Sequence, residues 1–289
     1  MIFSTNRNKL LIYAIFVFAA SITCAAEKIK TKKPANVVAL SKSVAEMWLL
    51  SGGSLVGTTT DALDLEGIGS AVSVGTLTTT SMEAVVSLNP SLVILTKDIP
   101  LHKKLTENCR ALGIRTYIVD VKNFADYERI MRNFTKETGR ADLFEKNVLS
   151  VKREIVSLCA DAKKRTRGTQ ATYLFLRTSS VKNKVLKDHF GNEIFQNLGL
   201  RSIVSDDSAL DELSVEAIVL EDPDYIFVVA QGDQKRAEEA FRKAYSSHPA
   251  WKSLSAAKNG HVIMLPKELF NYKPNASWAK AYQYVRDVL

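Results

Sequence analysis

The sequence predicts an α/β protein of two lobes, each with a mainly parallel sheet, joined by a single long interdomain helix. The helix is predicted for residues 141–165, which contain no Gly or Pro. Apolar residues recur there in steps of four and three, which places them on one face of a helix. Such a helix would rise about 35 Å, long enough to reach across two lobes. The apolar positions are Phe144, Val148, Val151, Ile155 and Leu158.

A repeat occurs once on each side of this helix. Residues 81–95 read SMEAVVSLNPSLVIL and residues 214–228 read SVEAIVLEDPDYIFV. Each copy is typical of a Ser N-cap, a short helix, a Pro that ends it and a buried strand. Convergence could make two helix–Pro–strand connections look alike, but two copies that flank one long helix favour a duplicated α/β unit.

The N-terminus is typical of an export signal. Basic residues precede an apolar run from Leu10 to Ala20, and small residues follow it. That run is too short to cross about 30 Å of hydrocarbon, so we interpret residues 1–26 as a signal peptide and residues 27–34 as a basic tether. Cys24 leaves a lipid anchor open as an alternative, although Thr23 and Ser21 fit the usual lipoprotein signal poorly.

Strands and helices alternate through the predicted N-terminal lobe, residues 35–140. Apolar strands are expected near residues 36–40 and 54–58, with a helix from Val44 to Leu50 between them. After the first repeat come a strand at Leu92–Thr96, a helix at Pro100–Leu112 and a strand at Arg115–Val119. Such alternation favours a parallel sheet.

The predicted C-terminal lobe, residues 166–289, begins with a similar strand, TYLFLRTSS. A helix that stops near Gly199, a strand and an acidic loop with Asp206, Asp207 and Asp211 follow. The second repeat, a charged helix, a turn at Asn259–Gly260, a last strand, an aromatic loop and a final helix complete the lobe.

Composition excludes some classes of function. The net charge of the 289 residues is +8, and part of it lies in the tether. Without aromatic residues between the basic ones or a groove-reading motif, nucleic acid is not an expected partner. An anionic ligand or a lipid surface suits the charge better. Outside the signal, Cys109 and Cys159 have no metal-binding or redox spacing, and free buried thiols are favoured over a disulfide.

Several segments together resemble the substrate-binding proteins of ABC importers for iron complexes, haem and cobalamin, the class III periplasmic binding proteins. These segments are the turn at Leu40–Ser41, VGTLTTTSMEAVVSLNPSLVIL (74–95), FGNEIFQNLGL (190–200) and HPAWKSLSAAKNGHVIML (248–265). The resemblance covers nearly the whole mature chain. It implies a protein of the periplasm or the outer face of the cytoplasmic membrane that is not an enzyme, has no cofactor of its own and delivers its ligand to a permease dimer.

The resemblance also implies a docking role for one acidic residue in each copy of the repeat. Glu83 and Glu216 match the positions that bind basic pockets of the two permease subunits. Two exposed carboxylates, one on each lobe, could orient the protein over the translocation path. The alternative is that both only balance the positive ends of their helices, as in a capping box.

Ligand residues are expected in loops that face each other across a cleft between the lobes. We expect a metal–organic complex, meaning a ferric siderophore, haem or a corrinoid, because the matching loops combine hydroxyls (Thr76, Thr78, Thr79, Thr80), cations (Lys42, Arg177, Lys273) and aromatic surface (Phe190, Phe270, Tyr272). Asp206 and Asp207 belong to a further candidate loop. The predicted ligand-binding residues are Ser41, Lys42, Asp61, Thr76, Thr78, Arg177, Phe190, Gln231, Tyr272 and Lys273.

The kind of complex stays open from the sequence. Haem binders of the family commonly place an iron-ligating Tyr where this chain has Thr76, so Tyr272 or His189 would have to replace it. A zinc or manganese binder is not expected, because the four histidines lie far apart in the sequence. An exported two-lobed enzyme, such as a tetrapyrrole chelatase, is the alternative from another class, although no cluster of acid, base or nucleophile supports it.

Overall fold

The computed structural model describes residues 34–165, 170–204 and 214–289. The predicted signal peptide, Cys24, the tether up to Lys33 and the acidic loop with Asp206, Asp207 and Asp211 lie outside the described residues. Within the described ranges, no helix combines the length and the apolar character that a membrane span needs.

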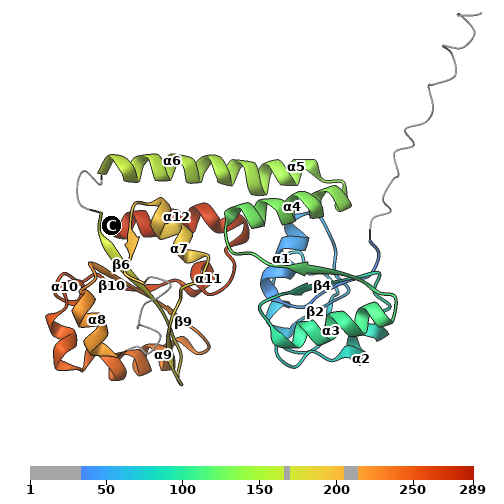
Figure 1. Ribbon diagram of the computed structural model, residues 1–289. Helices are drawn as coiled ribbons and strands as arrows, with labels where there is room; N and C mark the ends of the chain where they lie inside the picture. The colour runs from blue at the N-terminus through green and yellow to red at the C-terminus, as the bar shows by residue number, and fades with distance from the viewer. Residues whose placement is uncertain (1–33, 166–169, 205–213) are drawn as a thin grey trace, which may run out of the picture. The chain divides into compact units, whose positions relative to one another are not determined.

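The first lobe contains a sheet of five parallel strands in the order β3-β2-β1-β4-β5 (Figure 1). Because β2 and β3 lie on one side of β1 and β4 and β5 on the other, the strand order reverses between β1 and β4. The loops that leave these two strands therefore separate and open a crevice at their carboxyl ends. The strands are β1 (Val37–Ala39), β2 (Gly57–Thr58), β3 (Val72–Ser73), β4 (Leu92–Thr96) and β5 (Arg115–Val119).

Capping side chains fix where the helices of the first lobe begin. Ser41 Oγ accepts from the Val44 N–H at 3.4 Å, and Asn123 Oδ1 accepts from the Asp126 N–H at 2.9 Å. Gly139, with φ 74°, ends the longest of these helices. The helices are α1 (Lys42–Leu50), the 3₁₀ turn η1 (Thr60–Ala62), α2 (Met82–Ser87), α3 (Pro100–Ala111) and α4 (Phe124–Thr138).

The second lobe has a mostly parallel sheet in the order β10-β9-β6-β7, with β8 also paired to β6. Only the β6–β7 pair is antiparallel among the described strands. The fold class is thus confirmed as α/β with two mainly parallel sheets. The strands are β6 (Thr172–Thr178), β7 (Asn183–Val185), β8 (Arg201–Ser202), β9 (Tyr225–Ala230) and β10 (Val262–Leu265).

One helix of the second lobe begins with the same kind of Ser N-cap as a helix of the first lobe. Ser81 Oγ accepts from the Ala84 N–H at 3.2 Å, and Ser214 Oγ accepts from the Ala217 N–H at 3.1 Å, so both repeat helices have the predicted Ser N-cap. The described helices are α7 (Gly191–Asn197), α8 (Val215–Glu221), α9 (Gln234–Phe241), the π turn η4 (Arg242–Ser246), η5 (Pro249–Ser253), α10 (Ser255–Lys258), α11 (Lys267–Phe270), η6 (Asn275–Ser277) and α12 (Trp278–Val288).

The connecting segment, residues 141–165, is helical throughout but not α-helical throughout. It consists of α5 (Ala141–Phe144), a π-helical turn η2 (Glu145–Leu149) and α6 (Ser150–Arg165). The wider turn brings both Asn147 and Val148 inward, and Asn147 Nδ2 donates to Leu50 O at 2.8 Å. The spacing of the apolar residues did not predict this turn. A π turn shows in that spacing only as a shift of one residue, and the additional inward-facing residue here, Asn147, is polar.

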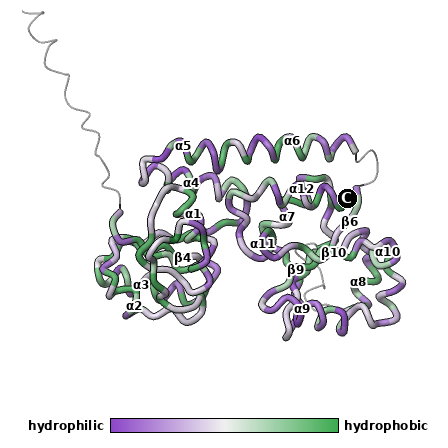
Figure 2. Tube along the Cα trace, turned by 180° about the vertical axis from the view of Figure 1, so that it is seen from behind, coloured by the Kyte–Doolittle hydropathy of each residue, from purple (hydrophilic) through white to green (hydrophobic). Residues whose placement is uncertain are grey.

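One cluster of buried apolar side chains runs from the first sheet through the connecting segment into the second lobe. Val148, Val151, Ile155 and Leu158 of the predicted stripe are all at most 8% exposed. In Figure 2 the outer helix α6 alternates between hydrophilic and hydrophobic residues, whereas the central strands are hydrophobic. Cys109 and Cys159 are free thiols.

We expect the substitution Asn147→Ala to lower the free energy of unfolding by about 1–3 kcal/mol, because it leaves the Leu50 carbonyl without this buried donor. Chemical denaturation followed by circular dichroism measures the change. The exposed neighbour Lys146→Ala is the control and should stay within about 0.5 kcal/mol of wild type. Equal effects of the two substitutions would contradict the structural role of the π turn.

Candidate functional site

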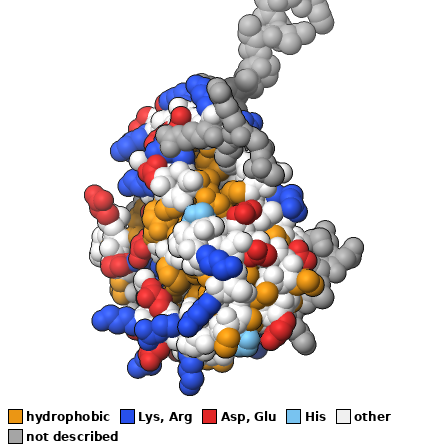
Figure 3. Space-filling view, turned by 90° about the vertical axis from the view of Figure 1, so that its left-hand side faces the viewer, with side chains coloured by type: hydrophobic (Ala, Val, Ile, Leu, Met, Phe, Trp, Pro, Cys, Tyr) orange, Lys and Arg blue, Asp and Glu red, His pale blue; other side chains and the backbone are white. Residues whose placement is uncertain are grey.

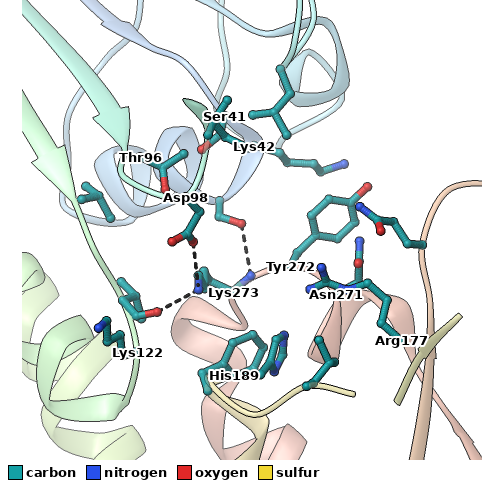
Figure 4. Close-up of a pocket in the computed structure, with 18 of the residues that line it drawn as sticks. Ser41, Lys42, Thr96, Asp98, Lys122, Arg177, His189, Asn271, Tyr272 and Lys273 are labelled. Atoms are coloured by element: carbon teal, nitrogen blue, oxygen red, sulfur yellow. Dashed lines mark hydrogen bonds and ion pairs between the residues drawn. The ribbon is translucent and has the colours of Figure 1, made fainter. Parts of the chain in front are cut away.

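A cavity of about 700 Å³ lies between the two lobes, and we call it the cleft. From the first lobe it is lined by the loops that follow β1, β4 and β5, which is where the reversal of strand order opens a crevice. From the second lobe it is lined by β6, β7 and the loops after β7, β9 and α11. Figure 4 shows side chains of both lobes pointing toward one another across this space.

Eight of the ten predicted ligand-binding residues line the cleft. Thr76 and Thr78 do not, although Leu77 between them does. Thr76 instead organises its own turn: its Oγ1 accepts from the Thr79 N–H at 3.2 Å, and its carbonyl accepts from Thr80 Oγ1 at 2.9 Å. The residues that line the cleft are Ser41, Lys42, Asp61, Arg177, Phe190, Gln231, Tyr272 and Lys273.

Among the described residues of the lining, basic side chains outnumber acidic ones by six to three. Sequence reasoning missed half of the basic residues. Lys184 faces Arg177 only because of the β6–β7 register, which the polar hairpin sequence does not reveal. Lys122 and Lys187 lie in short loops without a motif. The six are Lys42, Lys122, Arg177, Lys184, Lys187 and Lys273, and the three acids are Asp61, Asp98 and Asp188.

Arg177 is a partly buried, desolvated cation of the cleft. Its Nε is buried and has no hydrogen-bond partner among the described residues. Burial lowers the pKa of the guanidinium, while the more distant Asp98 opposes that shift. Lys184 of β7 is the residue directly opposite Arg177 in the antiparallel β6–β7 pair, and like charges at such paired positions repel each other. An anion in the cleft would relieve both the desolvation and the repulsion.

Lys273 and Lys42 already have protein partners. Lys273 Nζ donates to Val121 O at 2.8 Å and lies 3.5 Å from Asp98 Oδ2, so this lysine of the second lobe is bonded to the first. Figure 4 shows these contacts. Lys42 Nζ lies 2.6 Å from Asp64 Oδ1, and Asp64 is mostly exposed. Of these three cations, Arg177 is therefore the one best prepared for a ligand.

The aromatic residues do not form the predicted stacking surface. Phe190 is 1% exposed, packs against Trp278 and has Lys273 Nζ 5.3 Å from its ring centroid. Phe270 is fully buried and stacks on Phe195 within the core. Both were expected to offer ring faces to a flat ligand, but the sequence does not show that α12 and α7 cover them. Tyr272 keeps partial exposure in the lining.

His189 lines the cleft as a neutral imidazole. Burial, together with the positive charges of Lys273 and Arg177, holds its pKa well below the usual value. Its Nδ1 accepts from the Gly191 N–H at 3.1 Å, so the ring proton of the neutral form lies on Nε2. A metal ligand would need a bare Nε2, which makes His189 a poor substitute for an iron-ligating Tyr. Burial also raises the pKa of Tyr272 and so disfavours its phenolate.

The described residues contain no group of three or more His, Cys, Asp or Glu side chains that could hold a metal ion. The cleft therefore offers cations and hydrogen-bond donors to a complex that brings its own chelator. Its described residues do not offer the ligand set that a bare zinc or manganese ion requires.

The two predicted docking glutamates are exposed at the repeat helices. Glu83 lies in α2 and Glu216 in α8, and Figure 1 shows both helices on the side of their sheets away from α6. Neither Glu occupies the capping-box position, since the capped N–H belongs to the next residue, Ala84 or Ala217. His248 Nε2 lies 3.9 Å from Glu216 Oε1. Acidic and basic side chains are interspersed over this end of the second lobe (Figure 3).

The substitution His189→Gln tests the neutral state of this residue. Between pH 5 and 7 the unfolded chain binds a proton at His189 that the folded protein excludes, so folding gains free energy as the pH rises. The stability of wild type relative to His189→Gln should therefore increase with pH, by up to about 1.4 kcal/mol per pH unit below pH 6.5. Urea denaturation at pH 5, 6 and 7 measures it. Parallel stability curves would contradict a depressed pKa.

Comparisons with known proteins agree with this architecture. Residues 37–269 match the family described as periplasmic binding protein. The Fe(3+)-citrate-binding protein YfmC of Bacillus subtilis is 28% identical over 208 residues, which cover 68% of this chain and 60% of that relative. The alignment thus spans less than two thirds of the relative's length.

Solved structures share the fold over most of the chain. An ABC transporter substrate-binding protein from Listeria monocytogenes superimposes with a TM-score of 0.74 at 20% identity, covering 89% of this chain and 99% of that one. S. aureus IsdE complexed with heme gives a TM-score of 0.75 at 16% identity, covering 88% and 98%. With a family match that extends over both sheets and a cleft at their carboxyl edges, the chain belongs to the periplasmic binding protein family.

Proposed function

We propose that this chain is an extracytoplasmic substrate-binding protein that captures an iron complex or a tetrapyrrole in its cleft and delivers it to an ABC importer permease. The observation that carries the proposal is made on the described residues: basic side chains outnumber acidic ones in a cleft between two lobes, and Arg177 Nε has no hydrogen-bond partner among these residues. A charged hydrogen bond that a desolvated guanidinium donates to a ligand oxyanion is among the stronger polar contacts.

Among iron complexes, an anionic ferric siderophore or a ferric hydroxycarboxylate suits the cleft better than haem. Phe190 offers no exposed ring face, and His189 carries its proton on the nitrogen that iron would need. Oxyanions of a carboxylate or catecholate chelate could instead meet Arg177 and its neighbours. The name of the Bacillus subtilis relative, a Fe(3+)-citrate-binding protein, supports this order.

The proposed partner is a permease dimer at the outer face of the cytoplasmic membrane. Exposed Glu83 and Glu216, one on each lobe and both outside the cleft, would bind one basic pocket on each subunit. A signal peptide over residues 1–26 would deliver the protein to the periplasm or the outer face of the cytoplasmic membrane. In the alternative, cleavage before Cys24 and lipidation of this cysteine would anchor the protein to that membrane. The family is one of binding proteins, so the alternative of an exported chelatase is set aside.

Arg177→Ala should weaken the binding of ferric citrate by about 1.5–3 kcal/mol, roughly a 10- to 150-fold rise in Kd, because a charged hydrogen bond in a desolvated site is lost. Isothermal titration with ferric citrate, haemin, cobalamin, zinc and manganese identifies the ligand class on wild-type protein. Arg201→Ala removes an exposed arginine of β8 outside the cleft and should leave Kd unchanged. Binding of free zinc or manganese, with no metal complex bound, would contradict the proposal.

Reversing both docking charges, Glu83→Lys with Glu216→Lys, should abolish ligand-stimulated ATP hydrolysis by the cognate transporter in proteoliposomes and leave ligand binding intact. The matched control is Glu107→Lys with Glu239→Lys, which reverses two other exposed glutamates, on α3 and α9. ATPase stimulation that persists in the first variant, or fails equally in the control, would count against specific docking at the repeat helices.

A further inference from the structure

Two glutamate carboxylates form hydrogen bonds between the lobes. One belongs to the first lobe and accepts from the second, and the other belongs to the second lobe and accepts from the first. Glu46 belongs to α1 of the first lobe and accepts a hydrogen bond from Asn275 of the segment after β10. Glu193 belongs to α7 of the second lobe and accepts a hydrogen bond from the backbone of Phe124 in the first. Neither glutamate lines the cleft.

The first contact is built around a fully buried amide. Asn275 is 0% exposed, and its Nδ2 donates to Glu46 Oε2 at 2.6 Å and to Ser43 O at 3.0 Å. Both protons of the amide nitrogen are thereby directed at α1. Two residues earlier, the Lys273 N–H donates to Ser43 Oγ at 3.2 Å. The segment at residues 273–275 is therefore bonded to the same end of α1 that contributes Lys42 and Ser43 to the cleft.

The second contact caps a helix from the opposite lobe. Phe124 is the first residue of α4, and its N–H is one of the four that have no partner within a helix. Glu193 Oε2 accepts from it at 2.7 Å, while Asn123 accepts from the Asp126 N–H of the same turn. A carboxylate at this end of a helix also meets the positive end of the helix dipole. The ring of Phe124 packs against Trp278 at 5.7 Å.

These glutamates are costly to bury. Burial raises the pKa of both, since it disfavours the charged carboxylate. Lys42 partly offsets this for Glu46, whereas Asp126 adds to it for Glu193. What the carboxylates add is a directional bond between segments that belong to different lobes.

We propose that Glu46 and Glu193 are positioning residues that fix the relative arrangement of the two lobes and so bring the basic side chains of the cleft together. The two bonds lie on different helices, α1 and α7, and each requires its own donor to stay within hydrogen-bond distance. A relative movement of the lobes that separates either donor from its acceptor breaks that bond. The role is independent of which ligand the cleft takes.

Double electron–electron resonance on ligand-free protein measures the distance between the two lobes and its spread. Spin labels at Lys104→Cys on α3 and Lys235→Cys on α9, both exposed, report the distance between the lobes in a Cys109→Ala, Cys159→Ala background. The double variant Glu46→Ala with Glu193→Ala should broaden or shift the distance distribution. Glu46→Gln with Glu193→Gln keeps an acceptor oxygen at each site and should restore the wild-type distribution. An alanine variant with the wild-type distribution would overturn the proposal.

A second measurement holds even if the double alanine variant does not fold. In the single variant Glu193→Ala, the Phe124 amide should exchange with solvent at least tenfold faster by NMR, because its acceptor is gone. The Asp126 amide, bonded to Asn123 in the same turn, should keep its exchange rate and is the internal control. Unchanged exchange at Phe124, or equal acceleration at both amides, would show that Glu193 does not tie α4 to the second lobe.

Discussion

Apolar packing beneath the cleft is the interaction on which the rest of the structure depends. Trp278 is fully buried and touches Phe124 of the first lobe and Phe190 of the second. Together with the inward face of the connecting segment, these rings form one continuous cluster. This apolar cluster holds the two lobes together beneath the cleft, so the loops at the carboxyl ends of both sheets face each other across it. The cleft can therefore contain many like charges, because apolar packing and not charge pairing maintains its shape.

The charges of the cleft divide into those that maintain the protein and those that are available to a ligand. Lys273 donates a hydrogen bond to Val121 O and lies near Asp98, so its ammonium group connects the lobes and is less available to an anionic ligand. Arg177 Nε has no such partner in the part of the chain that the structure describes, and Arg177 pairs with Lys184 across the β6–β7 ladder. A protein that leaves a half-buried guanidinium beside a second cation forgoes stability at that point. Such a cost is expected where an anionic ligand supplies the missing charge.

Much of the fold was readable from the sequence because local signals and long-range packing agree. The Ser caps of the repeat helices, the buried strands β4 and β9 and the inward stripe of the connecting segment all lie where their residues predicted. The π turn was not readable, because inward-facing Asn147 is recognised only once Leu50 O is beside it. At the site, most of the described loops that strand ends predicted contribute residues to the cleft lining, and the loop with Asp206 and Asp207 lies outside the described residues. Which side chains of a loop enter the cleft depends on side-chain direction, which the sequence does not show. Leu77 lines the cleft while Thr76 and Thr78 do not. Lys184 lines it because of the β6–β7 register, and Phe190 is covered by Trp278.

The proposed function requires that the cleft hold an anionic metal complex through its basic side chains. Native mass spectrometry and absorbance spectroscopy of the protein purified from its own host under iron limitation would identify the bound ligand. We expect a mass increment of iron plus an organic acid chelator, with a broad visible charge-transfer band, and loss of both in Arg177→Ala. A bare zinc or manganese ion as the increment, or a bound ligand without acidic groups, would contradict the proposed function.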